Sequence, residues 1–287
     1  MNWVFLVLLS AVLLAAADII RKFVLKREHP LEFLAARGFF AVLVLFALVP
    51  WVSTDIDGRI LGLIYLAALV ATMGNYFQVK AQRHTDISYL SPLQSLTPIF
   101  LLIIAYLYLR ETVTVVQFLG IVAIVVGAYT LTVAPGKEFA LPFQEFKKEY
   151  WLHIWLSVVL LAIAAALDKY MLGMVRPITY LFFGWLFMNL NYIMINLWLY
   201  DWNHISVDIK KGWHWLLLAA VCIVGSGLSF FGALSMPGVL ISLALPLRYV
   251  SVLLETFFGG RLFHERNLAH RLVACVVMLV GVVLVVR

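Results

Sequence analysis

Apolar stretches of about 20 residues recur along the whole chain, and this feature constrains the fold more than any other. A helix of about 20 residues spans the roughly 30 Å of hydrocarbon in a lipid bilayer. Barrel strands would be shorter and would alternate in polarity along the sequence. Because backbone groups in lipid must satisfy their own hydrogen bonds, these stretches predict an all-α integral membrane protein that crosses the bilayer several times.

The composition favours the same class of protein. Hydrophobic residues make up 64% of the 287 residues and charged residues only 13%, whereas a soluble domain is about half apolar and about a quarter charged. Such a chain has too few polar residues to cover the surface of a water-exposed globule. The formal net charge is +6, and most charged residues lie in short segments beside the apolar stretches. We therefore expect membrane lipids, and not nucleic acid, as the partners of these charges.

Charged and turn-forming residues divide the sequence into ten apolar segments. The predicted transmembrane helices cover residues 3–25, 32–52, 60–82, 87–109, 114–134, 151–172, 178–200, 213–235, 238–260 and 268–286. Met236-Pro237-Gly238 predicts a tight turn before the ninth segment. The longest polar stretch, residues 135–150, lies at the midpoint of the chain and is typical of a linker between two halves.

The two halves of the chain resemble one another. A shift of 154 residues places Pro92 on Pro246, Leu93 on Leu247, Glu111 on Glu265 and Gly127 on Gly281, and a shift of 150 places Asp18 on Asp168. Chance similarity between apolar helices is the alternative, but proline, glutamate and glycine coincide at one shift. We therefore predict a first repeat at 1–134, the linker, and a second repeat at 151–287. Since each repeat has five helices, the second would enter the membrane inverted, as in many transporters.

A family resemblance rests on residues 84–129 (HTDISYLSPLQSLTPIFLLIIAYLYLRETVTVVQFLGIVAIVVGAY), which combine a proline-bearing fourth helix, a glutamate at the next turn and a glycine-bearing fifth helix. Residues 240–281 repeat this pattern more loosely. The chain thereby resembles the drug/metabolite transporter (DMT) superfamily, specifically its ten-helix EamA-like family. The resemblance implies a transporter whose central cavity is lined mainly by helices 1–4 and 6–9, with helices 5 and 10 peripheral. It leaves the substrate open, since members are similar in moving amino acids, nucleotide sugars, cationic drugs or lipid-linked sugars.

The positive charges indicate one membrane orientation and the resemblance implies the other. The face that carries the loops after helices 1, 3, 5, 7 and 9 has thirteen basic residues: Lys26, Arg27, Arg37, Lys80, Arg83, Lys137, Lys147, Lys148, Lys210, Lys211, Arg261, Arg266 and Arg271. The face that carries the termini has five: Arg59, Arg110, Lys169, Arg176 and Arg287. The positive-inside rule therefore predicts termini outside the cytoplasm, whereas the resemblance implies termini inside it.

Ionisable residues at membrane depth are costly in hydrocarbon and mark wet cavities or bundle interiors. Asp18 lies one turn before two basic residues in helix 1, which fits either a local ion pair or a carboxylate that binds a proton or the substrate. Its repeat mate Asp168, followed by Lys169, has the same two interpretations. The predicted residues for proton coupling or gating are Asp18, Asp168, Lys169 and Glu255.

Arg248 follows Pro246 by two residues in helix 9 and is the predicted charged anchor for the substrate. Proline frees a backbone carbonyl and locally breaks a helix, and a guanidinium fixed beside the break could bind a carboxylate or phosphate in bidentate fashion. A structural ion pair with Glu255 or Asp168 is the alternative. The other candidate substrate-binding residues are amides and aromatics, for which hydrogen bonding between helices is the alternative: Gln94, Asn75, Tyr76, Gln78, Trp185, Asn189 and Tyr192.

Three kinds of residue are assigned to the structure rather than to the site. Glu111 and Glu265 each precede a helix, where a carboxylate stabilises the positive end of the helix dipole. Glycines in helices 5 and 10 suit close helix packing. The two cysteines lie inside apolar segments and do not indicate a disulfide framework.

These observations predict a secondary transporter that moves a small polar metabolite, an amino acid or another anionic or zwitterionic solute, by alternating access, with proton coupling as an option. A flippase for a lipid-linked phosphate or sugar and a non-transporting scaffold are the alternatives. The sequence contains no hydrolase, kinase or redox motif and no metal-ligand spacing, so we expect no enzymatic activity, no metal and no cofactor. We expect the inner or plasma membrane of a prokaryotic cell, and either a monomer or a homodimer.

Overall fold

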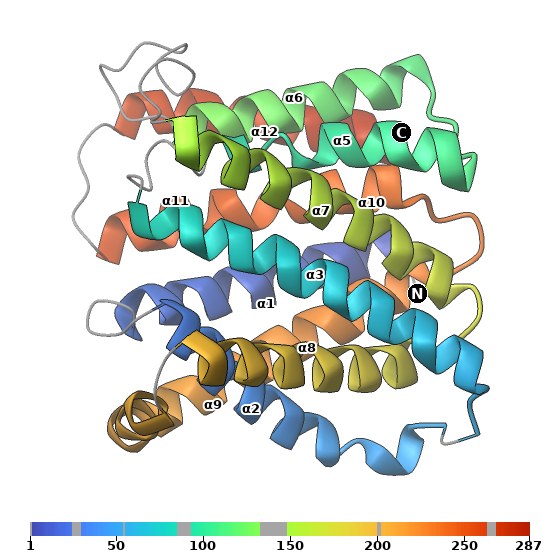
Figure 1. Ribbon diagram of the computed structural model, residues 1–287. Coiled ribbons are helices and arrows are strands. Elements are labelled where there is room, and N and C mark those ends of the chain that lie inside the picture. Colours follow the sequence, from blue (N-terminus) through green and yellow to red (C-terminus); the bar gives the residue numbers. More distant parts are fainter. Residues whose placement is uncertain are drawn as a thin grey trace.

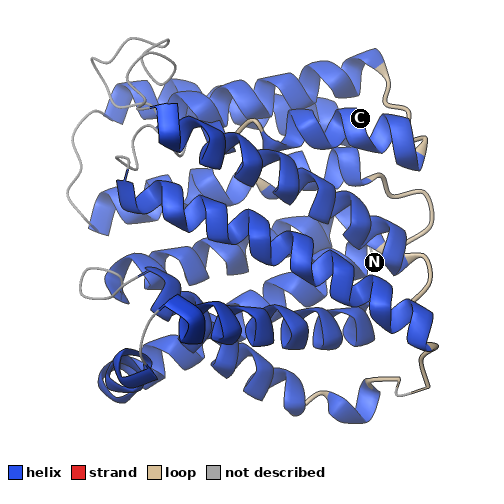
Figure 2. Ribbon diagram, in the orientation of Figure 1, coloured by secondary structure: helices blue, strands red, loops and turns tan. Residues whose placement is uncertain are grey.

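The computed structural model describes residues 2–24, 30–53, 55–84, 93–132, 148–199, 202–262 and 268–287. In these ranges the chain forms helices joined by short turns and contains no β-strand (Figures 1 and 2). The elements are α1 (Trp3–Val24), α2 (Pro30–Phe46), a 3₁₀ turn η1 (Val49–Trp51), α3 (Gly58–His84), α5 (Thr97–Ile104), a π-helical turn η2 (Ala105–Leu109), α6 (Val115–Thr132), α7 (Lys148–Leu172), α8 (Pro177–Leu199), α9 (Trp202–Leu234), α10 (Ile241–Arg248), α11 (Val250–Leu262) and α12 (Leu268–Val286). The predicted all-α class is confirmed for the described residues. Most of the predicted linker and Glu265 lie outside them.

Five of the described helices are long and apolar enough to cross a membrane. The spans are Trp3–Ile20, Gly58–Gln78, Leu152–Leu172, Pro177–Ile195 and Trp213–Leu234. Shorter apolar helical segments accompany them at Ala36–Phe46, Thr97–Leu109, Val115–Thr130 and Val273–Val286. Large apolar side chains such as Phe5, Phe39 and Val283 are exposed on the outside of the bundle. Lipid can cover such side chains at no hydrophobic cost, so the surface fits a bilayer better than water.

The ninth predicted helix breaks close to Pro246. The sequence predicts one helix over 238–260, but the structure divides it into α10 and α11 at Tyr249. Proline has no amide hydrogen to donate and its ring clashes with the preceding turn. The amide of Tyr249 donates to the carbonyl of Pro246 in a tighter turn. The helix break predicted beside Arg248 is therefore present, immediately after the arginine.

Two other predicted boundaries differ from the structure. α2 ends at Phe46 instead of 52, and Pro50 lies in the first turn of the 3₁₀ helix η1, the part of a helix in which proline fits. The fourth predicted helix ends at Leu109 as predicted, in the π-helical turn η2, and Arg110 then takes a left-handed conformation with φ 55°. α9 begins at Trp202, well before the predicted start at 213. The predicted turn at Met236-Pro237-Gly238 is confirmed, with Gly238 at φ 76°.

Helices from the two halves of the chain pack against one another. α1 packs on α9, α3 on α7, α2 on α8, and α6 on α12. Figure 1 shows α6 and α12 together at one side of the bundle and α2 and α9 toward the opposite side. Each of these pairs joins a helix before residue 133 to one after residue 147, so the halves are interleaved and do not form two separate bundles.

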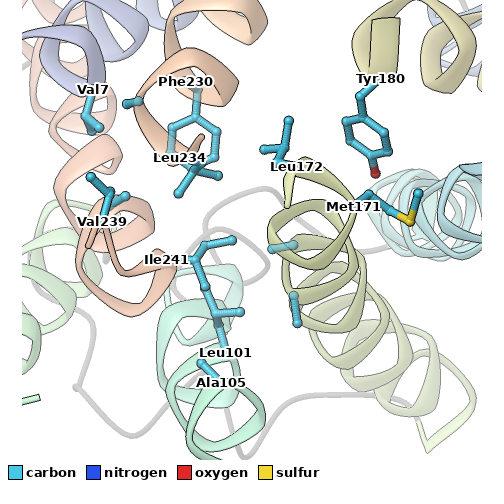
Figure 3. Packing of buried hydrophobic residues seen from close by; sticks show 14 of the residues in the cluster. Val7, Leu101, Ala105, Met171, Leu172, Tyr180, Phe230, Leu234, Val239 and Ile241 are labelled. Atoms are coloured by element: carbon cyan, nitrogen blue, oxygen red, sulfur yellow. The ribbon is translucent and has the colours of Figure 1, made fainter. Parts of the chain in front are cut away.

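A cluster of buried apolar side chains closes the end of the bundle where both termini lie (Figures 1 and 3). It draws on residues close to that end of several helices, including Val7 of α1, Leu172 of α7, Leu234 of α9 and Ile241 of α10. These four side chains are at most 7% exposed.

Glycines bring α6 and α12 into close contact, as the sequence predicts. A Cβ atom added at Gly120 would lie 2.8 Å from the carbonyl oxygen of Gly281, and one added at Gly281 would lie 2.7 Å from that of Gly120. Atoms essentially never approach a Cβ so closely, so a larger residue at either position would push the helices apart. The α6–α12 pair lies at one side of the bundle (Figure 1). The family resemblance implies such a peripheral position for helices 5 and 10.

Candidate functional site

A cavity of about 160 Å³ lies between α2, α3, α8 and α9. Its lining residues are Arg37, Gly38, Asn75, Trp185, Met188, Asn189, Tyr192 and Ile223. The lining thus combines a cation, two amides and two aromatic rings with aliphatic walls. Four of the predicted substrate-binding residues come together here: Asn75, Trp185, Asn189 and Tyr192.

Asn189 of α8 lies directly against the backbone of Gly38 in α2. A Cβ atom at position 38 would overlap the Oδ1 of Asn189 and lie 3.1 Å from its Cγ. Asn189 is 6% exposed, and its buried Oδ1 has no hydrogen-bond partner among the described residues. An unpaired buried acceptor is costly, and such atoms in native proteins commonly belong to a functional site.

Asn75 and Tyr192 form a connected polar pair in the cavity wall. Asn75 donates from Nδ2 to the carbonyl of Ala71, one turn earlier in α3, at 2.8 Å. Tyr192 of α8 shares a side-chain hydrogen bond with Asn75, and the charge of Arg37 acts on the Tyr192 phenol. The pair therefore ties α3 to α8 and holds two polar groups at fixed positions beside the arginine.

Asn191, also in α8, forms hydrogen bonds between helices. Its Nδ2 donates to the Oγ1 of Thr72 at 3.4 Å, and its Oδ1 accepts from the hydroxyl of Tyr65 at 3.5 Å. Both partners belong to α3. This residue fastens α3 to α8 and does not line the cavity.

Arg37 is the cavity residue that sequence reasoning missed. The sequence interpretation counts it among the loop charges of one membrane face, and this is wrong. The structure places it inside α2, about two turns after Pro30, as a lining residue of the cavity. The signal was in the sequence, because the apolar segment GFFAVLVLF continues the helix well beyond the arginine. An arginine within an apolar helix is an intramembrane cation and a candidate for function.

Arg248 belongs to a different polar cluster and does not line this cavity. Its Nη2 donates to the Oγ of Ser226 in α9 at 3.0 Å, and its guanidinium lies 4.4 Å from the centroid of the Phe230 ring. Ser226 in turn donates to the backbone carbonyl of Ser10 in α1 at 2.9 Å. The buried Nε of Arg248 has no hydrogen-bond partner among the described residues. The arginine is therefore held by α9 and α1 but keeps an unused donor.

The two repeat-related aspartates both act on Arg248. The charges of Asp18 in α1 and Asp168 in α7 both interact with the guanidinium. Tyr180 of α8 donates its hydroxyl to the Oδ1 of Asp168 at 2.5 Å. Asp18, Asp168 and Arg248 thus influence one another electrostatically, whereas the sequence interpretation pairs Asp18 with the basic residues one turn later in helix 1.

The remaining predicted residues do not line the cavity. The Nζ of Lys169 donates to the carbonyl of Leu234 at 2.6 Å, which satisfies the last residue of α9. Tyr76 packs against Phe77 with ring centroids 5.6 Å apart. Gln78 and Glu255 are half-buried on α3 and α11. The carbonyl of Gln94 accepts from the hydroxyl of Tyr249 at 3.1 Å, and its buried Nε2 has no hydrogen-bond partner among the described residues.

Comparisons with known proteins agree with this architecture. The model of the EamA-like transporter family matches residues 1–133. No curated protein matches the chain. A search of solved structures finds a crystal structure of a protein that is similar in fold, with a TM-score of 0.78 and 14% sequence identity over 98% of this chain and 95% of the other. An identity this low shows the shared fold alone.

The family match agrees with the apolar helices, which are several and long enough to span a bilayer. The chain is therefore an integral, multi-pass membrane protein, and the match indicates a transporter rather than an enzyme. The resemblance seen in residues 84–129 is therefore confirmed, because residues 1–133 of the chain match the EamA-like transporter family, which is part of the drug/metabolite transporter superfamily.

Proposed function

We propose that the protein is a secondary transporter that moves a small polar solute, anionic or zwitterionic, by alternating access. The cavity between α2, α3, α8 and α9 is the observation that carries this proposal. It brings Arg37 and two amide side chains together on apolar helices, and polar groups on membrane-spanning helices are costly unless they face a wet cavity or a ligand. A scaffold without transport activity would have no need of such a lining.

Two inverted five-helix repeats supply the moving halves in this proposal. Taking α5 with η2 as one crossing and α10 with α11 as another gives five crossings before residue 133 and five after residue 147. In the two repeats, α1 corresponds to α7, α2 to α8, α3 to α9 and α6 to α12. If the repeats are exchanged, the α1–α9 contact becomes the α7–α3 contact, and the α2–α8 and α6–α12 contacts stay the same. All four contacts exist, which supports the repeat. The family match over residues 1–133 covers the first repeat.

The size of the cavity favours a small solute over a lipid-linked one. A cavity of about 150 Å³ accommodates a molecule such as benzene, and this one has about 160 Å³. An isoprenyl-linked sugar is many times larger. The flippase is therefore kept as the second candidate only.

Coupling to protons is proposed for the group around Arg248. Asp18 and Asp168 both act on the guanidinium, so a proton gained by one carboxylate would change the charge balance between α1, α7 and α10. Arg248 remains a candidate substrate anchor, but its contacts with Ser226 and the aspartates give better support to a coupling role. Lys169 and Glu255 are further candidates for gating.

Transport in reconstituted liposomes tests the proposal. Liposomes that carry the purified protein are loaded with one unlabelled solute, and counterflow of the same labelled solute is measured across amino acids, carboxylates, nucleotide sugars, cationic drugs and isoprenyl phosphates. Saturable counterflow of a small anion or zwitterion is the expected result. Counterflow of isoprenyl phosphates alone would establish the flippase, and the absence of counterflow by every class would overturn transport.

Two further properties stay proposals. Charge distribution favours termini outside the cytoplasm, although Arg37 must now be removed from the loop charges, since it lies inside α2. A tag on the N-terminus that is accessible only in permeabilised cells would reverse this orientation. We also propose the inner or plasma membrane of a prokaryotic cell, with bilayer lipids around the exposed apolar side chains.

A further inference from the structure

We infer that the cavity is a two-point site for a small zwitterion, in which Arg37 binds a carboxylate and the Oδ1 of Asn189 accepts a hydrogen bond from a protonated amine. The inference names the substrate class of the proposed transporter, and it rests on that function only in taking the cavity as the substrate site. It assigns the anchoring charge to Arg37 of α2 and not to Arg248 of α10.

Arg37 supplies the first point of attachment. A guanidinium presents its N–H groups in a planar fork that matches the two oxygens of a carboxylate. Among the lining residues of the cavity, Arg37 is the one with a formal charge. Asn75 and Tyr192 flank it with polar groups that are already bonded to one another. A carboxylate that enters the cavity therefore meets one strong donor at a defined place.

Asn189 supplies the second point and narrows the ligand class. Asn189 lines the cavity, and its buried Oδ1, which lies against the lining residue Gly38, accepts no hydrogen bond from the described residues. An amide oxygen attracts N–H donors and opposes the oxygens of a phosphate or a dicarboxylate. A ligand that carries an ammonium group beside its carboxylate satisfies both Arg37 and Asn189, whereas a simple anion leaves the Asn189 acceptor unpaired.

The rest of the lining sets the size of the ligand. Trp185, Met188 and Ile223 form apolar walls, which suit an apolar side chain of the zwitterion. The volume of about 160 Å³ limits the ligand to the range of the smaller amino acids. Gly38 makes the arrangement possible, since any side chain at that position would displace the Asn189 amide.

Binding to the detergent-purified, full-length protein tests the inference. The probes are the common amino acids, their amides, which lack the carboxylate, their N-acetyl derivatives, which lack the ammonium group, and inorganic phosphate. Dissociation constants come from isothermal titration calorimetry, supported by ligand-dependent melting temperatures. We expect at least one small amino acid to bind, and its amide and N-acetyl derivative to bind about tenfold more weakly or worse, because each replaces a charge-assisted hydrogen bond by a weaker neutral one.

Two variants test the two points of attachment separately. Arg37→Met should abolish the preference for the free acid over the amide, and Asn189→Leu should abolish the preference for the free amine over the N-acetyl derivative. Arg59→Met, which removes an exposed charge on α3, should leave both preferences intact. Melting temperatures without ligand identify any variant that fails to fold, and Arg37→Lys and Asn189→Ser then take its place in the same comparison.

The outcomes separate this inference from transport. Binding of N-acetyl derivatives or phosphate as tightly as the free amino acid would overturn the two-point site, and so would the absence of binding by every zwitterion. Selective binding of a zwitterion without counterflow in liposomes would support the two-point site and would overturn the proposed transport function. Counterflow of a solute that Arg37→Met and Asn189→Leu both carry at the normal rate would overturn the site and leave transport standing.

Discussion

The carboxylate of Glu111 accepts two hydrogen bonds from Ser242, from its amide at 3.0 Å and from its hydroxyl at 2.6 Å, although the two residues lie 131 positions apart. A third bond, from the amide of Ile241 at 2.9 Å, completes the contact. Glu111 is 7% exposed, and Ile241 and Ser242 are the first residues of α10. A residue of the first half thus caps a helix of the second half, at the end of the bundle where the termini lie.

Replacement of Glu111 should destabilise the protein in graded steps. Glu111→Gln keeps the shape but removes the charge, so we expect a loss of about 2 kcal/mol, since hydrogen bonds to charged groups are the stronger ones. Ser242→Ala removes one of the three bonds and should cost less. Thermal unfolding in detergent measures both. Equal melting temperatures for Glu111→Gln and the unmodified protein would show that the cap carries no stability.

Because α6 and α12 pack closely, a single added methyl group at their contact should lower the stability of the protein markedly. Gly120→Ala would place a Cβ 2.8 Å from the carbonyl oxygen of Gly281, and overpacking of this kind costs about 1–3 kcal/mol. Gly184→Ala is the matched control, because a Cβ there meets no atom within 4 Å and alanine favours a helix over glycine. We expect the melting temperature to fall for the first and to hold or rise for the second. The reverse order would contradict the helix contact.

Because Gly38 packs against Asn189, a substitution at Gly38 should weaken recognition of the ligand, although Gly38 has no side chain that could bind it. Gly38→Ala would displace the Asn189 amide from its position, so the preference for a free amine over its N-acetyl derivative should fall by about tenfold. Gly232→Ala is the control, since its added Cβ would lie 4.0 Å from the Cδ1 of Leu6. Calorimetric titration of both variants makes the comparison. An unchanged preference in Gly38→Ala would argue against a role for Asn189.

Replacement of Ser226 should destabilise the protein more than replacement of Ser10, the residue of α1 to which Ser226 is hydrogen-bonded. Ser226→Ala removes the hydroxyl that accepts from Arg248 and donates to the Ser10 carbonyl, and a buried guanidinium that loses an acceptor costs about 1.5–3 kcal/mol. Ser10→Ala removes only the contact between the two hydroxyl oxygens, which lie 2.9 Å apart. Melting temperatures of the two variants measure the difference. A larger effect of Ser10→Ala would show that Arg248 does not depend on Ser226.

The proposed coupling role of Asp168 predicts a change in how transport depends on a pH gradient. Asp168→Asn should carry out counterflow but should no longer accumulate solute when a proton gradient is imposed, because the amide cannot exchange a proton. Tyr180→Phe removes the hydroxyl that donates to Asp168 and should leave accumulation in place with an altered pH profile. Accumulation by Asp168→Asn at the normal level would place the coupling elsewhere.

Several features could be predicted from the sequence because they depend on local chemistry. Apolar stretches long enough for a bilayer give helices whatever their neighbours are, and the break beside Arg248 follows from the covalent geometry of Pro246. The small size of Gly120 and Gly281 permits close helix contact wherever those helices meet. Trp185, Asn189 and Tyr192 could be singled out, because polar and amphipathic residues in an apolar helix seek a polar environment.

The partners of the same residues depend on packing, which the sequence does not encode locally. The sequence assigns Glu111 to the helix that follows it, but the carboxylate caps α10, because the chain folds back so that the two halves interleave. Arg37 resembles a loop charge until α2 is placed against α8, and the contacts of Arg248 with Ser226 and Phe230 become visible only when α10 is placed against α9.

Helix formation is a property of short segments, and the sequence therefore determined the helices, the membrane and the transporter family. Which side chain meets which depends on how distant helices dock, through many weak contacts that act together. Only the tertiary structure could therefore place Arg37, Gly38 and Asn189 at one cavity and Arg248 outside it.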